Sequence, residues 1–282
     1  MQEDAIAIEK SRPGEGIWAE KPDYRNTAKH KYTSDNVSYK LNDVFIYDYY
    51  YIDKAGIKKK FLVNDRNDSI NNPLNTGSYD KPAYNTIDKI MLVVTDVREN
   101  YPQCDSTCTQ TTIAYYYLTK NALQHKNCGK LIIKEKDQPY FYCEAVSTGV
   151  VDNRKNIWIH PPRQHTFKIL QLNPFPFYYL DESIDKWAYS VEVGGKYLDP
   201  RWISAKENIV LRLNYIRMKD EELSTSFGKL HCKVVNGTGT SVFDNQIFKT
   251  RLKSYYHPAY GFVKLEYVNI DRPKMVIQLI KG

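Results

Sequence analysis

The sequence has no run of about 18 apolar residues, the length that a membrane-spanning helix requires, so it predicts no such helix. The first four residues, MQED, lack the basic and apolar regions of a secretory signal peptide. From the residues alone two interpretations stay open. The chain is either a cytoplasmic protein or the mature segment of an exported protein preceded by an added methionine.

Recognisable catalytic and metal-binding motifs are also missing: there is no G-x-S-x-G, no HExxH and no P-loop. Residues 65–76 alternate oxygen ligands like a calcium loop, but Ile70 stands where Gly is required and Thr76 where Glu is required. Cys104 or Cys108 beside His125 is a conceivable nucleophile–base pair that the spacing does not support. We therefore predict no catalytic residue, no metal and no cofactor, and a non-enzymatic role is favoured over an enzymatic one.

The five cysteines fit no standard zinc pattern, because CxxC is absent and no His pair follows at the right distance. Cys104 with Cys108 and Cys128 with Cys143 are candidates for local disulfides, which would leave Cys232 unpaired. Buried free thiols are the alternative.

Positive charge is modest and dispersed along the chain. Forty Lys and Arg against 33 Asp and Glu give a net charge of +7, and the densest run is residues 58–60. A nucleic-acid-binding protein would concentrate its cations on one helix or face, so we expect no nucleic-acid partner. Mild attraction to anionic polymers or lipid head groups stays open.

Aromatic residues are abundant: they make up 13% of the chain, and 24 residues are tyrosine. They suit half-buried sheets as well as ligand surfaces, and sheet packing is the favoured interpretation. Strand-like segments separated by polar turns predict an antiparallel sandwich or barrel. These segments are residues 41–53, 57–64, 90–97, 111–119, 131–136, 140–151, 156–160, 165–172, 187–193, 208–217, 229–236, 246–257, 260–269 and 274–281. Residues 181–187 are the best candidate for a short helical turn.

Period-two alternation is clearest near the end of the chain. Leu230, Cys232 and Val234 share one face of a strand whose other face is charged, which places Cys232 in the core. Residues 263–267 alternate in the same way. Strands with one solvent-exposed face and one buried face are typical of antiparallel sheets.

The chain divides by composition into three regions. Residues 1–40 are polar and read as an extended or loosely attached arm. Residues 41–150 form an N-terminal β region and residues 151–282 a C-terminal β region, either as separate units or as one continuous domain.

Two proline-broken segments are candidate ligand sites. In residues 158–165 (WIHPPRQH), His160, Arg163 and His165 could line a polar site, although a corner that fixes strand geometry is favoured. Residues 173–179 (NPFPFYY) could be a lid over an apolar ligand or an exposed binding patch, and the alternative is a loop packed over one end of the core. The candidate ligand-binding residues are Trp158, His160, Arg163, Phe175, Phe177, Tyr178 and Tyr179.

Four stretches carry a family resemblance: NIWIHPPR (156–163), LNPFPFYYL (172–180), TSFGKLHCKVVNGTG (225–239) and residues 255–282. In these the C-terminal half resembles uncharacterised exported proteins and lipoproteins of Bacteroidetes that are similar to the DUF3108 group, whose fold is related to the open barrels of the carriers LolA and LolB. The resemblance implies a curved antiparallel sheet or half-open barrel with few short helices, around an apolar groove. It also implies export to the periplasm or the outer membrane, with membrane association only through a lipid anchor. The family offers no established catalytic residues to transfer.

The expected function is that of an exported cell-envelope binding or scaffolding protein that holds a lipid or another apolar or amphipathic ligand beneath residues 173–179. The alternative is an interaction module that grips a glycan or an envelope protein with exposed aromatic residues. A hydrolase acting on envelope polymers ranks third, because the sequence shows no recognisable nucleophile–base pair and no recognisable set of metal ligands.

Overall fold

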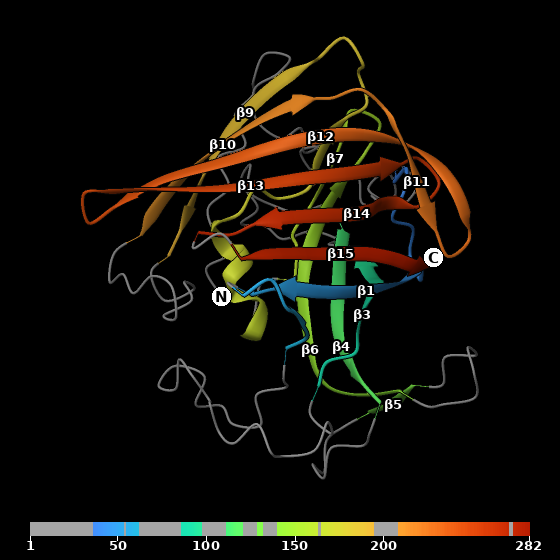
Figure 1. Ribbon diagram of the computed structural model, residues 1–282. Helices are drawn as coiled ribbons and strands as arrows, with labels where there is room; N and C mark the ends of the chain where they lie inside the picture. Colours follow the sequence, from blue (N-terminus) through green and yellow to red (C-terminus); the bar gives the residue numbers. More distant parts are fainter. Residues whose placement is uncertain are drawn as a thin grey trace, which may run out of the picture.

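Fifteen strands form one antiparallel sheet in the part of the chain that the structure describes (Figure 1). The computed structural model describes residues 36–53, 55–61, 86–97, 111–120, 129–131, 140–162, 165–194, 208–270 and 273–282. Within these ranges the one helix of the element order is a 3₁₀ helix, η4 (His165–Leu172). No helix in the same ranges is long and apolar enough to cross a membrane.

The strands alternate with turns and loops along the chain. They are β1 (Val44–Ile52), β2 (Lys58–Lys59), β3 (Lys89–Val97), β4 (Thr111–Thr119), β5 (Gly129–Leu131), β6 (Tyr140–Asp152), β7 (Asn156–Ile159), β8 (Phe177–Tyr179), β9 (Lys186–Val193), β10 (Ile209–Arg217), β11 (Glu221–Thr225), β12 (Gly228–Phe243), β13 (Gln246–His257), β14 (Gly261–Val268) and β15 (Lys274–Lys281).

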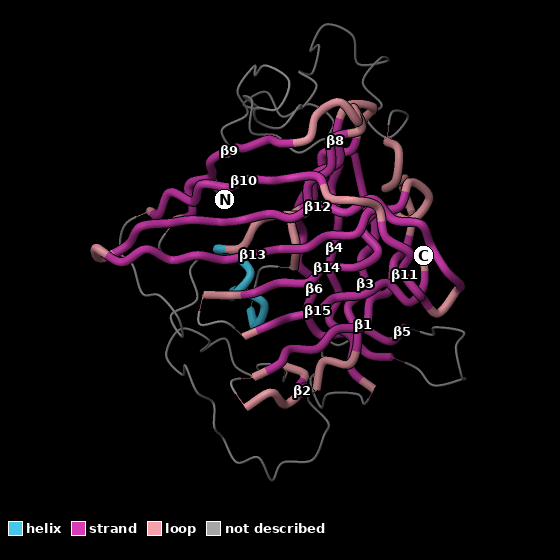
Figure 2. Tube along the Cα trace, turned by 45° about the horizontal axis from the view of Figure 1, so that its top comes forward, coloured by secondary structure: helices cyan, strands magenta, loops and turns pink. Residues whose placement is uncertain are grey.

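The order of strands across the sheet is β8-β7-β6-β4-β3-β1-β15-β14-β13-β12-β10-β9, with β2, β5 and β11 attached to β1, β6 and β12. Strands β3, β4 and β6 run across the direction of β12 to β15 in two views of the molecule (Figures 1 and 2). The sheet is therefore strongly curved, and its two ends, β8 and β9, are not paired with each other. This confirms the predicted fold class. Because β1 pairs with both β3 and β15, residues 41–150 and 151–282 contribute to the same sheet.

Alternation along β12 and β14 buries one face of each strand, as the period-two pattern predicts. Cys232 and Val234 are fully buried, whereas His231 is exposed. Val263 and Tyr267 are buried in the same way on β14. Burial raises the pKa of the Cys232 thiol to about 11, so the thiol stays protonated at neutral pH.

One predicted strand, residues 165–172, is wrong, because this segment forms η4. Phe167 and Leu170 are three residues apart and fully buried, which fits the three-residue period of a 3₁₀ helix. Pro161 and Pro162 precede the segment and lack the N–H groups that a continuing strand would donate.

The helical turn predicted for residues 181–187 is also wrong. The Asp181 carboxylate accepts hydrogen bonds from the backbone N–H and the hydroxyl of Ser183, at 2.9 and 2.6 Å. This local pairing forms a turn, as is typical of Asp at such positions. Strand β9 then begins at Lys186.

The last residues of the predicted N-terminal arm are attached to the sheet by one buried carboxylate. Asp152 accepts hydrogen bonds from the backbone amides of residues 37–39, at 2.9, 2.8 and 2.7 Å. Burial raises the pKa of Asp152, while the three amide donors favour its charged form. Residues 36–40 are thereby fixed against the sheet, and residues 1–35 lie outside the described part.

Inward-facing glycines let another part of the chain lie directly on β12. A Cβ atom at Gly237 would come 2.8 Å from Cβ of Pro174 and 3.0 Å from Cε1 of Tyr215. Next to it, the Thr250 hydroxyl donates a hydrogen bond to the Leu172 carbonyl at 2.6 Å. Glycine in a strand interior is typical where another backbone approaches closely. The sequence pattern predicts the end of this strand at residue 236, whereas β12 continues to Phe243 because its later residues pair with both β10 and β13.

The substitution Gly237→Ala should lower the free energy of unfolding by about 1–3 kcal/mol, because the added methyl group overpacks the contact with Pro174. Thr238→Ala is the matched control, since Thr238 lies on the exposed face of the same strand and its loss should change stability by about 0.5 kcal/mol or less. Urea unfolding followed by circular dichroism measures both. Equal stability of the two variants would contradict the close approach.

Candidate functional site

Residues 173–179 lie between the two ends of the curved sheet. Strand β8 pairs with β7 at one end. Its side chains meet the strands of the other end: the Phe177 ring lies 5.6 Å from the Trp187 ring and 5.5 Å from the Tyr215 ring. Tyr178 stacks on Tyr256 at 4.6 Å. Aromatic packing therefore joins two sheet ends that no backbone ladder connects.

Polar side chains add directed contacts to this junction. The Arg217 guanidinium, at the end of β10, donates Nη2–H bonds to the carbonyls of Tyr179 and Asp181, both at 3.0 Å, and an Nε–H bond to the Ile184 carbonyl at 3.2 Å. It also lies over the Tyr178 ring at 4.7 Å. Arg217 thus holds the chain segment that leads from β8 to β9.

Two aromatic side chains make further hydrogen bonds across the junction. Tyr215 donates from its hydroxyl to the Phe175 carbonyl at 2.9 Å. The Trp158 indole N–H donates to the Tyr189 hydroxyl at 2.8 Å. Burial raises the pKa of Tyr189 and of Tyr215, so both hydroxyls stay neutral and act only as hydrogen-bonding groups.

The structure brings the described members of the predicted ligand set together, but inside the core. The exposed fractions are Trp158 0%, His160 4%, Phe175 0%, Phe177 0%, Tyr178 2% and Tyr179 1%. The His160 ring lies 4.4 Å from the Trp158 ring and 5.1 Å from the Phe175 ring. Arg163 lies outside the described residues. Residues 173–179 are thus not an exposed patch, and the role of this segment as a lid and of the set in ligand binding stays a prediction.

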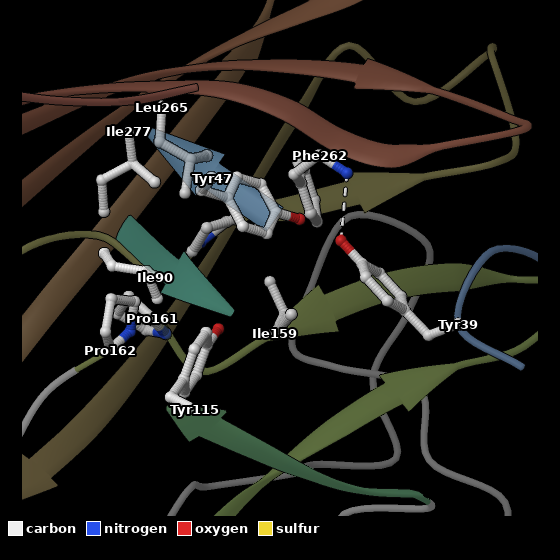
Figure 3. A pocket seen from close by; sticks show the side chains of 11 residues that line it. Tyr39, Tyr47, Ile90, Tyr115, Ile159, Pro161, Pro162, Phe262, Leu265 and Ile277 are labelled. Carbon is white, nitrogen blue, oxygen red and sulfur yellow. Dashed lines mark hydrogen bonds between the residues drawn. The ribbon is translucent and has the colours of Figure 1, made fainter. Parts of the chain in front are cut away.

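A cavity beside this junction is small. It lies between the sheet and the loop containing Pro161 and Pro162, and Tyr39, Tyr47 and Tyr115 are among the side chains around it (Figure 3). Its volume is about 20 Å³, room for roughly one water molecule. An acyl chain does not fit in this space.

The tyrosines around the cavity are fixed and neutral. Tyr115 donates a hydrogen bond to the His160 carbonyl at 2.7 Å, and the Tyr39 hydroxyl accepts one from the Phe262 amide at 3.0 Å (Figure 3). Burial raises the pKa of Tyr39, Tyr47 and Tyr115, so none supplies a phenolate at neutral pH. The cavity therefore has the character of a packing defect lined by satisfied groups.

Exposed aromatic platforms, which the alternative interpretation requires, are not found among the described residues: every described Tyr and Trp is buried or half-buried. No three His, Cys, Asp or Glu side chains in the described part are grouped so that they could hold a metal ion. The calcium-like loop, the Cys–His pair and the side chains of both candidate disulfides lie outside it.

Sequence reasoning missed a second surface, the outer face of β9, β10, β12 and β13. It carries the exposed side chains of Val210, Arg212, Val242, Ile247 and Lys249. Alternation in β10 and β13 predicts which residues point outward. It does not tell which of them become neighbours, because that depends on the register of three strands.

The sequence matches no family model, and it has no match among curated proteins. Three solved structures are similar in shape. A predicted exported protein with a YmcC-like fold from Bacteroides fragilis is 10% identical, with a TM-score of 0.43, over 87% of this chain and 97% of that one. A predicted lipoprotein from Parabacteroides distasonis is 11% identical, with a TM-score of 0.38, over 87% and 97%. The hypothetical lipoprotein YmcC from Escherichia coli is 8% identical, with a TM-score of 0.33, over 93% and 99%.

Likenesses this distant carry no functional argument. The resemblance to the DUF3108 group and to the LolA and LolB barrels is not confirmed by these matches.

Native mass spectrometry of the purified protein, with solvent extraction of the same sample, tests the predicted ligand site. We expect the mass of the chain alone and no extracted acyl lipid, because the six described residues of the predicted set are packed against one another and against the sheet. A stoichiometric lipid that is released only on unfolding would contradict the packed interior. Protein refolded from denaturant is the control for adventitious lipid.

Proposed function

We propose that the protein is a non-catalytic binding or scaffolding component of the cell envelope, exported from the cytoplasm, that contacts its partners through the outer surface of its sheet. The observation that carries this proposal is the filled space between the two ends of the sheet. Residues of β7, β8 and the loop between them fill it with buried aromatic rings.

The packing around β8, in the part of the chain that the structure describes, argues against a carrier of the kind that the sequence resemblance implies. Pockets for small ligands usually measure about 300–1,000 Å³. The cavity beside β8 measures about 20 Å³. Binding at a surface is therefore better supported than enclosure of an apolar ligand.

The outer surface offers a large and regular platform. Strands β12 and β13 pair over eleven positions and end in a two-residue turn at Asp244 and Asn245, both with positive φ. Such a turn matches the twist of long hairpin strands. The hairpin projects beyond its neighbours at the left of Figure 1. A long, twisted and partly projecting sheet suits contact with an extended partner.

Envelope location rests on the sequence resemblance of the C-terminal half to exported proteins. A net charge of +7 is compatible with attraction to anionic envelope polymers and lipids. The glycan-binding alternative receives less support, because every described Tyr and Trp is buried or half-buried.

Fractionation of the natural host tests this proposal. The protein expressed from its own full-length gene should appear in the periplasmic or envelope fraction, and purified chain should sediment with isolated envelopes. A cytoplasmic marker protein of similar size is the control. Recovery of the protein in the cytoplasm, together with a failure to sediment with envelopes, would refute the proposed role.

A further inference from the structure

We infer that the outer face of β9, β10, β12 and β13 is a docking surface for the anionic head groups of a phospholipid bilayer, with the apolar side chains near the β12–β13 turn entering the interface. We call this surface the wing face. The inference rests on the proposed envelope role and names the partner of the surface.

Strand register places three exposed apolar side chains side by side. Val242 pairs with Ile247 across the hairpin. Val210 precedes Leu211 on β10, which pairs with Ser241, so Val210 lies beside Val242 on the same face. Their exposed fractions are 53% for Val210, 64% for Val242 and 66% for Ile247. Single exposed apolar residues are ordinary, but three adjacent ones next to a projecting turn indicate a contact site.

The next two rows of the wing face carry cations. Arg212 pairs with Thr240, which pairs with Lys249. One row further on, Thr238 pairs with Arg251. All three cations therefore lie on the face that carries the apolar row, one or two rows behind it, and all three are exposed.

These cations have no carboxylate partner among the described residues, whereas several lysines on neighbouring strands form ion pairs. Lys233 pairs with Glu182 at 2.6 Å, Lys253 with Glu221 at 2.8 Å and Lys264 with Glu266 at 2.6 Å. Within the described strands Arg212, Lys249 and Arg251 make no such ion pair. The wing face therefore presents three cations without a direct carboxylate partner in the described part of the chain.

Two acidic residues border the surface. Glu192, on β9, pairs with Val210 and so lies beside the apolar row, where its carboxylate accepts a hydrogen bond from the Asn208 amide at 2.6 Å. Asp244 occupies the turn itself and has a positive φ of 50°. Near an anionic surface the Asp244 charge is unfavourable, which offers a test that strengthens binding instead of weakening it.

Apolar tips beside unpaired cations match the chemistry of an anionic bilayer interface. There apolar side chains enter the boundary between head groups and acyl chains, while Lys and Arg contact lipid phosphates. An acidic protein would satisfy the cations but gives no reason for apolar residues at the projecting end. A single-stranded nucleic acid would require aromatic stacking surfaces, which the wing face lacks in the described strands.

Sedimentation with vesicles tests the inference. The full chain should bind vesicles of phosphatidylcholine with about one-third phosphatidylglycerol, should not bind pure phosphatidylcholine, and should be released by salt. The triple variant Arg212→Gln, Lys249→Gln, Arg251→Gln should weaken binding on the order of 100-fold, from about fivefold for each cation. Asp244→Asn should strengthen it about fivefold, and Asn keeps the positive φ.

The matched control removes three exposed cations from other surfaces: Lys120→Gln, Arg154→Gln and Lys229→Gln. It has the same net charge as the wing variant and should keep binding within about fivefold. An equal loss in both triple variants would mean attraction by net charge alone and would overturn the assigned surface. Circular dichroism and thermal unfolding confirm that each variant is folded.

Insertion of the apolar row has its own test. A tryptophan introduced as Val242→Trp should shift its emission to shorter wavelength with the mixed vesicles, measured as a difference from the wild-type spectrum. The double variant Val242→Ser, Ile247→Ser should bind more weakly even at low salt. If the introduced tryptophan does not shift, the apolar row does not enter the interface and the inference fails.

The outcomes separate the two proposals. Sedimentation with envelopes but not with vesicles would overturn the lipid assignment and leave the envelope role intact, with an acidic protein or polymer as the partner. Failure to bind both would refute both.

Discussion

The structure depends on the packing of one proline-rich segment between the ends of an open sheet. Strand β8 is held by its ladder with β7, and its rings contact Trp187, Tyr215 and Tyr256 on strands at or near the opposite end. Burying such rings contributes roughly 1.5–3 kcal/mol each, and aromatic pairing adds to this. Together with η4, whose Phe167 ring stacks on Tyr117 at 4.9 Å, this packing covers the concave side of the sheet.

The sequence predicted the strands whose signal is local and missed the features that depend on distant residues. Residues 111–119, 246–257 and 274–281 match β4, β13 and β15 because strand propensity and turn residues suffice there. By contrast, the predicted segment 229–236 stops short of the two buried glycines of β12, whose place in the strand depends on a distant residue, Pro174, that lies against Gly237. The prediction of a strand from period-two patterning was also wrong for η4, because the buried apolar side chains there are three residues apart, as in a 3₁₀ helix.

The candidate site shows the same limit. Residues 173–179 were singled out correctly as an unusual apolar segment, but no local signal tells whether such a segment covers a ligand or replaces one. Here Phe175 and Phe177 are fully buried and packed against other aromatic rings of the core. The wing face could not be found at all from one strand, because Val210, Val242 and Ile247 are neighbours only through the register of β10, β12 and β13. The buried aromatic rings around β8 and the apolar and cationic rows of the wing face together favour binding at the outer surface over enclosure of a ligand.

Hydrogen–deuterium exchange at the β7–β8 pair tests the central claim, that this junction is part of the stable core. The Leu180 amide bonds to the Lys155 carbonyl at 2.9 Å and the Ile159 amide to the Pro176 carbonyl at 3.1 Å. If aromatic packing closes the sheet, these two amides should exchange only through global unfolding, with the same opening free energy as the amides of β13. Exchange through a local opening, much faster than in β13, would show that residues 173–179 move as a lid and would contradict the account.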